Sequence, residues 1–193
     1  MSKPVFQRRG FRVRGFTLVE MMITITVAVI LLVIAVPSFN YIINSNRLTT
    51  TANAMIGSLN TARMAAVQRN ASVQFCSNSA TSNTSDTLGG ACGTNAGAVL
   101  ALTSPGAATT TPVLTAPSEL SISSIQIHGT IAAIRFNGQG QGLVPGTSTP
   151  FDSSTGGVVV DVCSTALSTN NHIQVSMAAG SIITTTPSTG ACP

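Results

Sequence analysis

One carboxylate, Glu20, stands directly before an uncharged apolar run that covers residues 21–39. A charged side chain at the centre of a membrane helix costs about 2.5–3.5 kcal/mol on insertion scales, and less near the membrane surface. A plain membrane anchor gains nothing from such a group. Glu20 is therefore the first candidate for a functional side chain, because its charge becomes favourable only where a cationic group lies opposite it.

The other residues that could do acid–base or nucleophilic chemistry are few and scattered. No acid pair after Glu20 has a spacing typical of general acid–base catalysis, and no Ser/His/Asp set is discernible. The acids in question are Asp86, Glu119, Asp152 and Asp161. His128 falls in an alternating segment that predicts a strand, whereas His172 follows two asparagines and is expected in a turn. We predict no catalytic residue, no cofactor and no enzymatic activity.

Neither a nucleotide-binding loop nor a metal site is expected. The glycine-rich stretch at residues 138–142 is followed by Leu143-Val144-Pro145-Gly146, which predicts no helix, whereas a phosphate-binding loop opens one. A turn explains these glycines better, because glycine supplies the positive φ that such turns need. No Cys-x-x-Cys occurs, and both histidines lie far in sequence from any cysteine, so the metal prediction is none.

The distribution of charge separates a basic leader from the rest of the chain. The formal net charge is +4, but residues 16–193 hold four basic and five acidic side chains. The leader contributes Lys3, Arg8, Arg9, Arg12 and Arg14. Basic residues before an apolar run mark a cytoplasmic flank, so they do not indicate nucleic-acid binding by the rest. Charged residues make up 7% of the chain against about 25% in typical soluble domains, which favours an extracellular β-rich domain.

The apolar run has three interpretations. A cleaved secretory signal is disfavoured, because an apolar region there usually has about 7–15 residues and a small-x-small cleavage site, which is missing here. A plain membrane anchor fits the length of the run. The third interpretation also accounts for the order of Gly15, Phe16 and Glu20.

The segment RGFTLVEMMI, followed by an apolar stretch that ends in AVP, resembles the class III leader and N-terminal helix of type IV prepilins and type II secretion pseudopilins. The resemblance implies that a prepilin peptidase cuts after Gly15 and methylates Phe16. It further implies that Glu20 neutralises the new amine of Phe16 in a neighbouring subunit, and that Pro37 kinks the helix. Residues 1–15 would then be the cleaved leader.

A second resemblance covers residues 46–70. There, NRL and the ending ARMAAVQRN are similar to the FimT/FimU and GspH branch of minor pilins and pseudopilins. Beyond residue 75 the match is looser and rests on Phe136 to Gly140, on residues 160–164 and on Cys192. The resemblance implies an α+β pilin fold, in which a long N-terminal helix packs on an antiparallel sheet.

The residue pattern agrees with that organisation. We expect a membrane or filament-core half of the helix at residues 16–39 and an amphipathic half at 40–70. The latter carries one apolar stripe with steps of three and four, formed by Leu48, Ala52, Met55, Ile56, Leu59, Ala62, Ala66 and Val67. Residues 71–193 form a β-rich periplasmic or extracellular head.

Short alternating segments of that head predict strands. These segments are residues 72–75, 98–102, 120–123, 125–128, 131–136, 158–162, 173–177 and 182–186. Residues 77–97 and 103–118 are rich in Ser, Thr, Ala, Gly and Pro and are expected to be surface loops.

Four cysteines in a segment expected outside the inner membrane favour two disulfides. Four cysteines allow three pairings. We favour Cys76–Cys92, which would close a polar loop, and Cys163–Cys192, which would tie the C-terminal tail to an inner strand.

The expected function is that of a minor type IV pilin. It would insert in the inner membrane with its head in the periplasm, join major and minor pilins, and help to start the pilus, near the tip. One alternative is a GspH-like pseudopilin of a type II secretion system. Another is a DNA receptor for natural transformation, but where related receptors carry a Gly-Arg-x-Arg patch this chain has Ser181 and Ile183, so DNA is not an expected partner.

Overall fold

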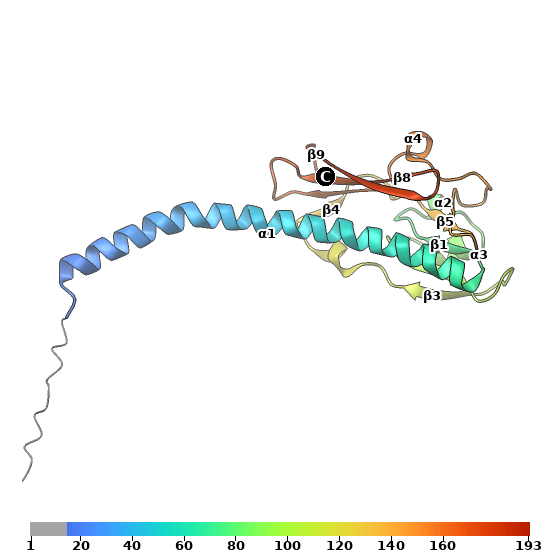
Figure 1. Ribbon diagram of the computed structural model, residues 1–193, viewed down its shortest axis with the longest axis horizontal. Coiled ribbons are helices and arrows are strands. Elements are labelled where there is room, and N and C mark those ends of the chain that lie inside the picture. The colour runs from blue at the N-terminus through green and yellow to red at the C-terminus, as the bar shows by residue number, and fades with distance from the viewer. Residues whose placement is uncertain (1–14) are drawn as a thin grey trace, which may run out of the picture. The chain divides into compact units, whose positions relative to one another are not determined.

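The computed structural model describes residues 15–193, apart from the side chains of residues 155 and 156. Most of the predicted leader, residues 1–14, therefore lies outside the described residues. The chain divides into two compact units, Met1–Asn40 and Tyr41–Pro193. Helix α1 (Leu18–Arg69) contributes to both units, and each is described by itself (Figure 1).

The first unit contains the apolar part of α1. An 18-residue window of this helix has a mean hydropathy of 2.7, and none of its residues is buried. Within residues 15–193, α1 alone is long and apolar enough to cross a membrane. Pro37 lies inside the helix, which is not interrupted there although proline offers no backbone N–H. A bend at Pro37 stays a prediction.

In the second unit, the amphipathic part of α1 buries one face against the head. Its buried side chains are Leu48, Thr51, Ala52, Met55, Ser58, Leu59, Ala62, Ala65 and Ala66. The predicted stripe is correct except at its margins, because Ile56 is half-buried and Val67 is 51% exposed. Thr51 and Ser58 are tolerated on this face because their hydroxyls donate to the carbonyls of Arg47 and Ala54, four residues earlier.

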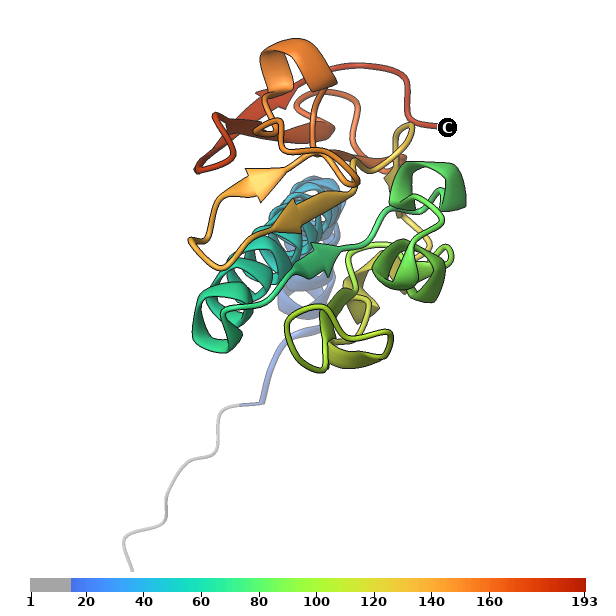
Figure 2. The same ribbon diagram turned by 90° about the vertical axis from the view of Figure 1, so that its right-hand side faces the viewer.

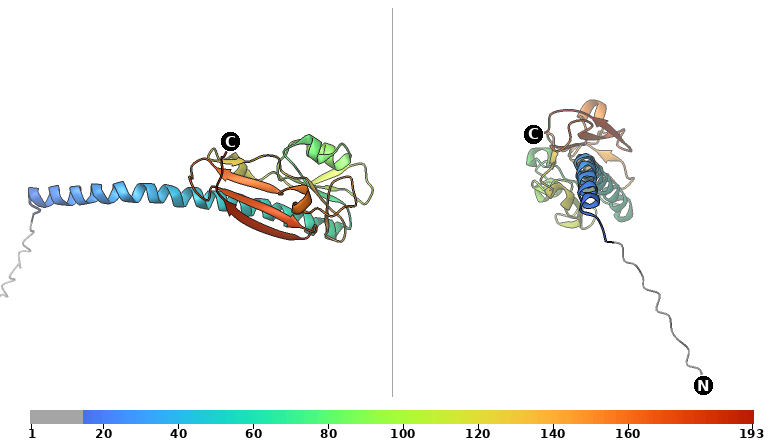
Figure 3. Two further views of the ribbon diagram at one scale, coloured as in Figure 1. Left: turned by 90° about the horizontal axis from the view of Figure 1, so that it is seen from above. Right: turned by 90° about the vertical axis from the view of Figure 1, so that its left-hand side faces the viewer.

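The strands of the head form two antiparallel sheets. One has the order β3-β2-β1-β5-β6 and the other the order β4-β7-β8-β9. The first comprises β1 (Val73–Phe75), β2 (Val99–Leu102), β3 (Thr110–Leu114), β5 (Ile134–Phe136) and β6 (Gly142–Leu143). The second comprises β4 (Ile125–Ile127), β7 (Val160–Ser164), β8 (His172–Ala178) and β9 (Ile182–Ser188). Figure 3 shows β8 and β9 as a long antiparallel pair, in register from His172↔Ser188 to Ala178↔Ile182.

One hydrophobic core joins both sheets to α1. Its largest fully buried members include the rings of Phe75 and Phe136, together with Met55, Leu59 and Ile134. Figure 2 shows strands of both sheets grouped around the Tyr41–Arg69 part of the helix. The predicted α+β architecture, a long apolar N-terminal helix packed on antiparallel sheet, is therefore confirmed.

Several local predictions were wrong. Residues 118–121 form a 3₁₀ helix, η1 (Ser118–Ser121), in place of the strand predicted at 120–123. The loop predicted at 77–97 contains the short helices α2 (Ala80–Asn83) and α3 (Thr87–Cys92), and the loop at 103–118 contains strand β3. A further short helix is α4 (Ser153–Gly156). Tertiary contacts determine the secondary structure of these polar segments, because their sequences show no clear apolar periodicity.

Candidate functional site: the helix start at Gly15 to Glu20

The side chains of Thr17 and Glu20 cap the start of α1 through reciprocal hydrogen bonds. The Thr17 hydroxyl accepts a hydrogen bond from the Glu20 backbone N–H at 3.2 Å. The Glu20 carboxylate in return accepts from the Thr17 backbone N–H and hydroxyl, each at 3.3 Å. This is the reciprocal capping box of a Thr-x-x-Glu sequence, in which two helix-end N–H groups without intrahelical partners are satisfied. This capping box was not predicted, although the Thr-x-x-Glu pattern of residues 17–20 indicates it.

The capping box leaves the carboxylate of Glu20 near the chain end that precedes the helix. Acidic groups in the first turn are favourable there, because the unsatisfied N–H groups give this end of a helix a partial positive charge. Glu20 is exposed, and a side chain placed at Gly15 would meet no described atom within 4 Å. Packing within the described residues therefore does not explain why position 15 holds a glycine.

The side chains after Glu20 present an apolar surface on every side of the helix. Those more than half exposed include Met21, Met22, Ile23, Ile25, Leu31, Leu32, Val33, Ile34 and Phe39. The two threonines in this stretch hide their hydroxyls: Thr24 donates to the Met21 carbonyl at 2.9 Å and Thr26 to the Met22 carbonyl at 2.7 Å. A helix whose polar groups are satisfied internally and whose surface is apolar suits a lipid or a protein-filled filament core.

Comparison with known protein families gives two matches. Residues 10–36 match the prokaryotic N-terminal methylation motif, which includes Gly15, Phe16 and Glu20. Residues 51–180, more than half of the chain, match the family of the type II transport protein GspH. The chain belongs to the GspH family. The predicted resemblance is thereby confirmed, and the protein is a GspH-like minor pilin or pseudopilin. No curated protein and no solved structure gives a significant match.

The two disulfides of this GspH-family head join the pairs that were predicted. Cys76, directly after β1, is bonded to Cys92 at the end of α3, and Cys163 on β7 is bonded to Cys192 in the C-terminal tail. All four cysteines are paired. The first disulfide closes the segment that contains α2 and α3, and the second holds the tail against the four-stranded sheet.

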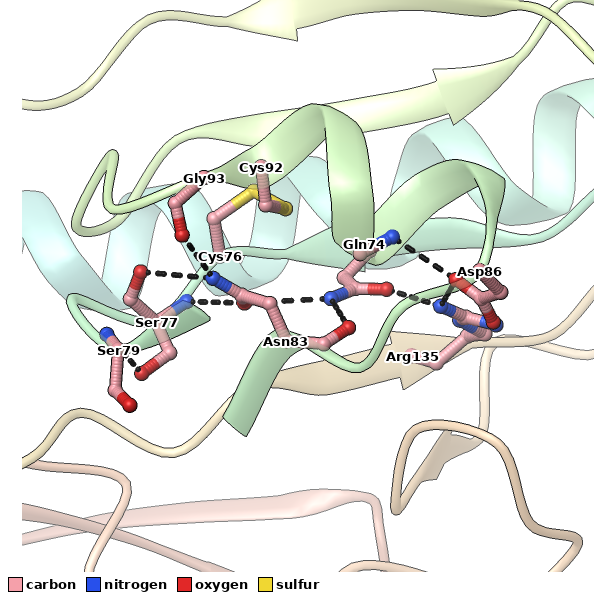
Figure 4. The surroundings of a disulfide bond; sticks show 10 residues. Gln74, Cys76, Ser77, Ser79, Asn83, Asp86, Cys92, Gly93 and Arg135 are labelled. Carbon is pink, nitrogen blue, oxygen red and sulfur yellow. Dashed lines mark hydrogen bonds and ion pairs between the residues drawn. A yellow bond between two sulfur atoms is a disulfide. The ribbon is translucent and has the colours of Figure 1, made fainter. Parts of the chain in front are cut away.

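Beside the first disulfide, Asn83 uses its whole side-chain amide inside the protein (Figure 4). Its Nδ2 donates to the carbonyls of Ser77 at 3.1 Å and Gly93 at 3.0 Å, while its Oδ1 accepts from the Ser77 N–H at 2.7 Å. Buried Gln74 donates to the Asn83 backbone carbonyl at 3.0 Å. These contacts replace a sheet ladder in the segment that was predicted to be a loop.

DNA binding would draw on clustered arginines, and Arg63, Arg69 and Arg135 are three of the four arginines after residue 16. Arg63 donates to the carbonyls of Ser181 at 2.6 Å and Gly180 at 3.4 Å, and its guanidinium lies 5.6 Å from the Phe136 ring centroid. Arg69 donates to the Thr111 hydroxyl at 2.9 Å, and Arg135 pairs with Asp86. The guanidinium groups of these three arginines are thus engaged within the head.

Asp86 caps α3 and anchors Arg135. Its Oδ1 accepts from the Gly89 N–H at 2.9 Å and from Nη2 of Arg135 at 2.8 Å, and its Oδ2 accepts from Nη1 of Arg135. Arg135 also donates to the side-chain carbonyl of Gln74. The hydrogen bonds from Arg135 lower the pKa of Asp86 from 3.8 to about 2.

This shift predicts an acid-sensitive contribution to stability. Because the pKa of Asp86 is depressed in the folded state, its contribution is fully present above about pH 4 and is lost as the pH falls to about 2. The variant Asp86→Asn should be less stable than wild type at pH 7, and the difference should shrink between pH 4 and pH 2. Circular dichroism of the detergent-solubilised chain in denaturant measures this, and a constant difference across that range would contradict it.

Proposed function

We propose that the protein is a minor subunit of a type IV pilus. On this proposal, prepilin peptidase removes residues 1–15 after Gly15 and methylates Phe16. The protein then rests in the inner membrane with its head in the periplasm, and later enters a filament of major and minor pilins. The observation that carries the proposal is the arrangement of Gly15, Phe16 and Glu20 at the head of an exposed apolar helix in a GspH-family chain.

The orientation follows from charge. The five basic residues before residue 15 would stay in the cytoplasm by the positive-inside rule, which sends the C-terminal head to the other side. The two disulfides suit the oxidising periplasm. Each predicted segment has its own role on this proposal. The leader directs processing, and residues 16–39 anchor the chain in the membrane. Residues 40–70 pack on the head, and the head, residues 71–193, is exposed at the surface.

Glu20 supplies the pairing charge on this proposal. Its carboxylate holds Thr17 in its own chain, and it retains further lone pairs that can accept from the amine of Phe16 in a neighbouring subunit. Two unit charges 4 Å apart attract by about 4 kcal/mol at an effective dielectric constant of 20. That attraction is of the same order as the insertion cost of the carboxylate, about 2.5–3.5 kcal/mol at the centre of a membrane and less near its surface. Assembly with a neighbour therefore offsets the cost of the charge.

We further propose that the protein acts in pilus initiation and lies near the filament tip, a role suggested by the resemblance of residues 46–70 to the FimT/FimU branch. The match to a type II transport family favours a second candidate, a minor pseudopilin of a secretion system. Both candidates share the processing and assembly steps and differ in the filament that is built.

A deletion strain separates the two candidates. If the protein initiates pili, its loss should remove most surface pili while secretion of type II substrates continues, and the tagged protein should co-purify with other minor pilins. Restoration by the wild-type gene serves as the control. Normal piliation together with lost secretion would overturn the pilus assignment in favour of the secretion system.

A further inference from the structure

Three side chains that could bind a metal meet at one end of the four-stranded sheet. The strand register places Cys163 opposite His172 and Asp161 opposite Gln174. His128 directly follows β4, where its backbone N–H donates to the Asp161 carbonyl at 2.8 Å. Because side chains alternate along a strand, Asp161 and Cys163 share one sheet face, and the partner strands bring both histidines to the same face.

The three side chains converge on one point. Nδ1 of His172 lies 3.0 Å from Oδ1 of Asp161, and Nδ1 of His128 lies 3.5 Å from Oδ2 of Asp161. One ligand atom from each residue lies within 4.8 Å of the other two. Ligand atoms at the corners of a zinc tetrahedron are about 3.3 Å apart, given zinc–nitrogen bonds of about 2.0 Å. Two of the contacts already have nearly this spacing.

The surroundings hold two of the three ligands firmly. The side chains of Asp161 and His172 are 5% and 4% exposed, whereas that of His128 is 50% exposed. Gln174 donates to Oδ2 of Asp161 at 3.2 Å, which fixes the carboxylate plane in the manner of residues that support metal ligands.

An opening to solvent adjoins the cluster. A hollow of about 210 Å³ is lined by His128, Asp161 and His172 on the sheet and by residues 188–191 of the tail. The disulfide between Cys163 and Cys192 holds that tail over the sheet. A small cation can therefore reach the three ligands, while the tail covers part of the site.

We propose that His128, Asp161 and His172 form a binding site for a divalent transition cation such as Zn²⁺. Two imidazoles and one carboxylate are ligands that zinc favours, whereas Ca²⁺ and Mg²⁺ favour oxygen ligands throughout. Binding requires the His128 side chain to move toward the other two residues. That movement is possible because the side chain is half exposed and is followed by Gly129. No metal site was predicted from the sequence, because only the strand register brings these distant residues together. This inference is independent of the proposed pilus function.

A bound metal would link three strands of the sheet. The ligands come from the end of β4, from β7 and from β8, and the disulfide at Cys163 ties the same region to the C-terminal tail. A bound cation would add a crosslink between strands at the sheet edge formed by β4. Zinc should therefore raise the unfolding temperature of the chain as well as bind it.

The test is zinc titration of the full chain in detergent, purified without a polyhistidine tag. Calorimetry should show one Zn²⁺ per chain. The variant His128→Gln should bind at least tenfold more weakly, since loss of even a supporting residue costs about 10–100-fold in metal affinity. Glu119→Gln, which changes a carboxylate in η1 outside the cluster, is the matched control and should bind as wild type does.

A second measurement guards against a folding defect in the variant. The chain has two histidines, so its ¹⁵N imidazole spectrum contains signals from this cluster alone. Zinc should shift the signals of both histidines of the wild-type chain together, and Ca²⁺ should leave them in place. Absence of zinc binding, equal binding by His128→Gln, or unshifted imidazole signals would each overturn the site.

Discussion

Replacement of Glu20 by glutamine is expected to lower incorporation of the protein into filaments at least tenfold while its membrane insertion stays at the wild-type level. Glutamine can take the place of glutamate in a capping box, so the start of α1 is preserved. Only the charge is lost, and with it the attraction to the amine of Phe16 in a neighbouring subunit. Immunoblots of sheared filaments and of the membrane fraction measure the two quantities.

The variant Thr17→Ala is the matched control for this prediction. It removes the hydroxyl that accepts from the Glu20 N–H, at a cost of about 1 kcal/mol to the helix end, but keeps the carboxylate. If the charge of Glu20 is what filaments need, Thr17→Ala should be incorporated nearly normally. Normal incorporation of Glu20→Gln, or an equal loss in both variants, would mean that Glu20 serves the helix cap alone.

Truncation of Met55 to alanine is expected to destabilise the head by about 2–5 kcal/mol, the range for a buried methionine. Met55 is fully buried on the face of α1 that joins the core. It also packs against Gly97: a Cβ added at Gly97 would lie 2.8 Å from its sulfur. Denaturant unfolding of the detergent-solubilised chain, followed by circular dichroism, gives the change in free energy.

Met64 supplies a control on the same helix. Its side chain is 55% exposed, so Met64→Ala removes little buried surface and should change the free energy of unfolding by no more than about 0.5 kcal/mol. Equal effects of the two truncations would contradict the assignment of the buried face. Both residues lie in the unit Tyr41–Pro193, so the comparison concerns packing of the head alone.

Features that depend on residues close together in the sequence were predictable. The apolar stripe around Met55 follows from helical periodicity, and the helix itself from a long apolar run with an N-terminal motif. The motif at Gly15, Phe16 and Glu20 is local as well, so its parts could be recognised without the fold. The capping box of Thr17 and Glu20, three residues apart, is local too and could have been predicted from the same segment.

Features that depend on distant contacts were not predictable. Asn83 stabilises its segment by bonds to Ser77 and Gly93, and a polar segment of this kind has no period that distinguishes it from a loop. His172 was expected in a turn but begins β8 and is buried, because the ladder with β7 extends to it and the tail covers it. The cluster with Asp161 follows from that register.

The intact mass of the protein purified from membranes tests the central claim most directly. We predict a chain that begins at Phe16 and carries one added methyl group, with residues 1–15 removed and both disulfides intact. The same measurement in a strain without prepilin peptidase should return the full chain from Met1. A wild-type mass that still includes residues 1–15, or a cut at another position, would contradict the account of Gly15 and Glu20.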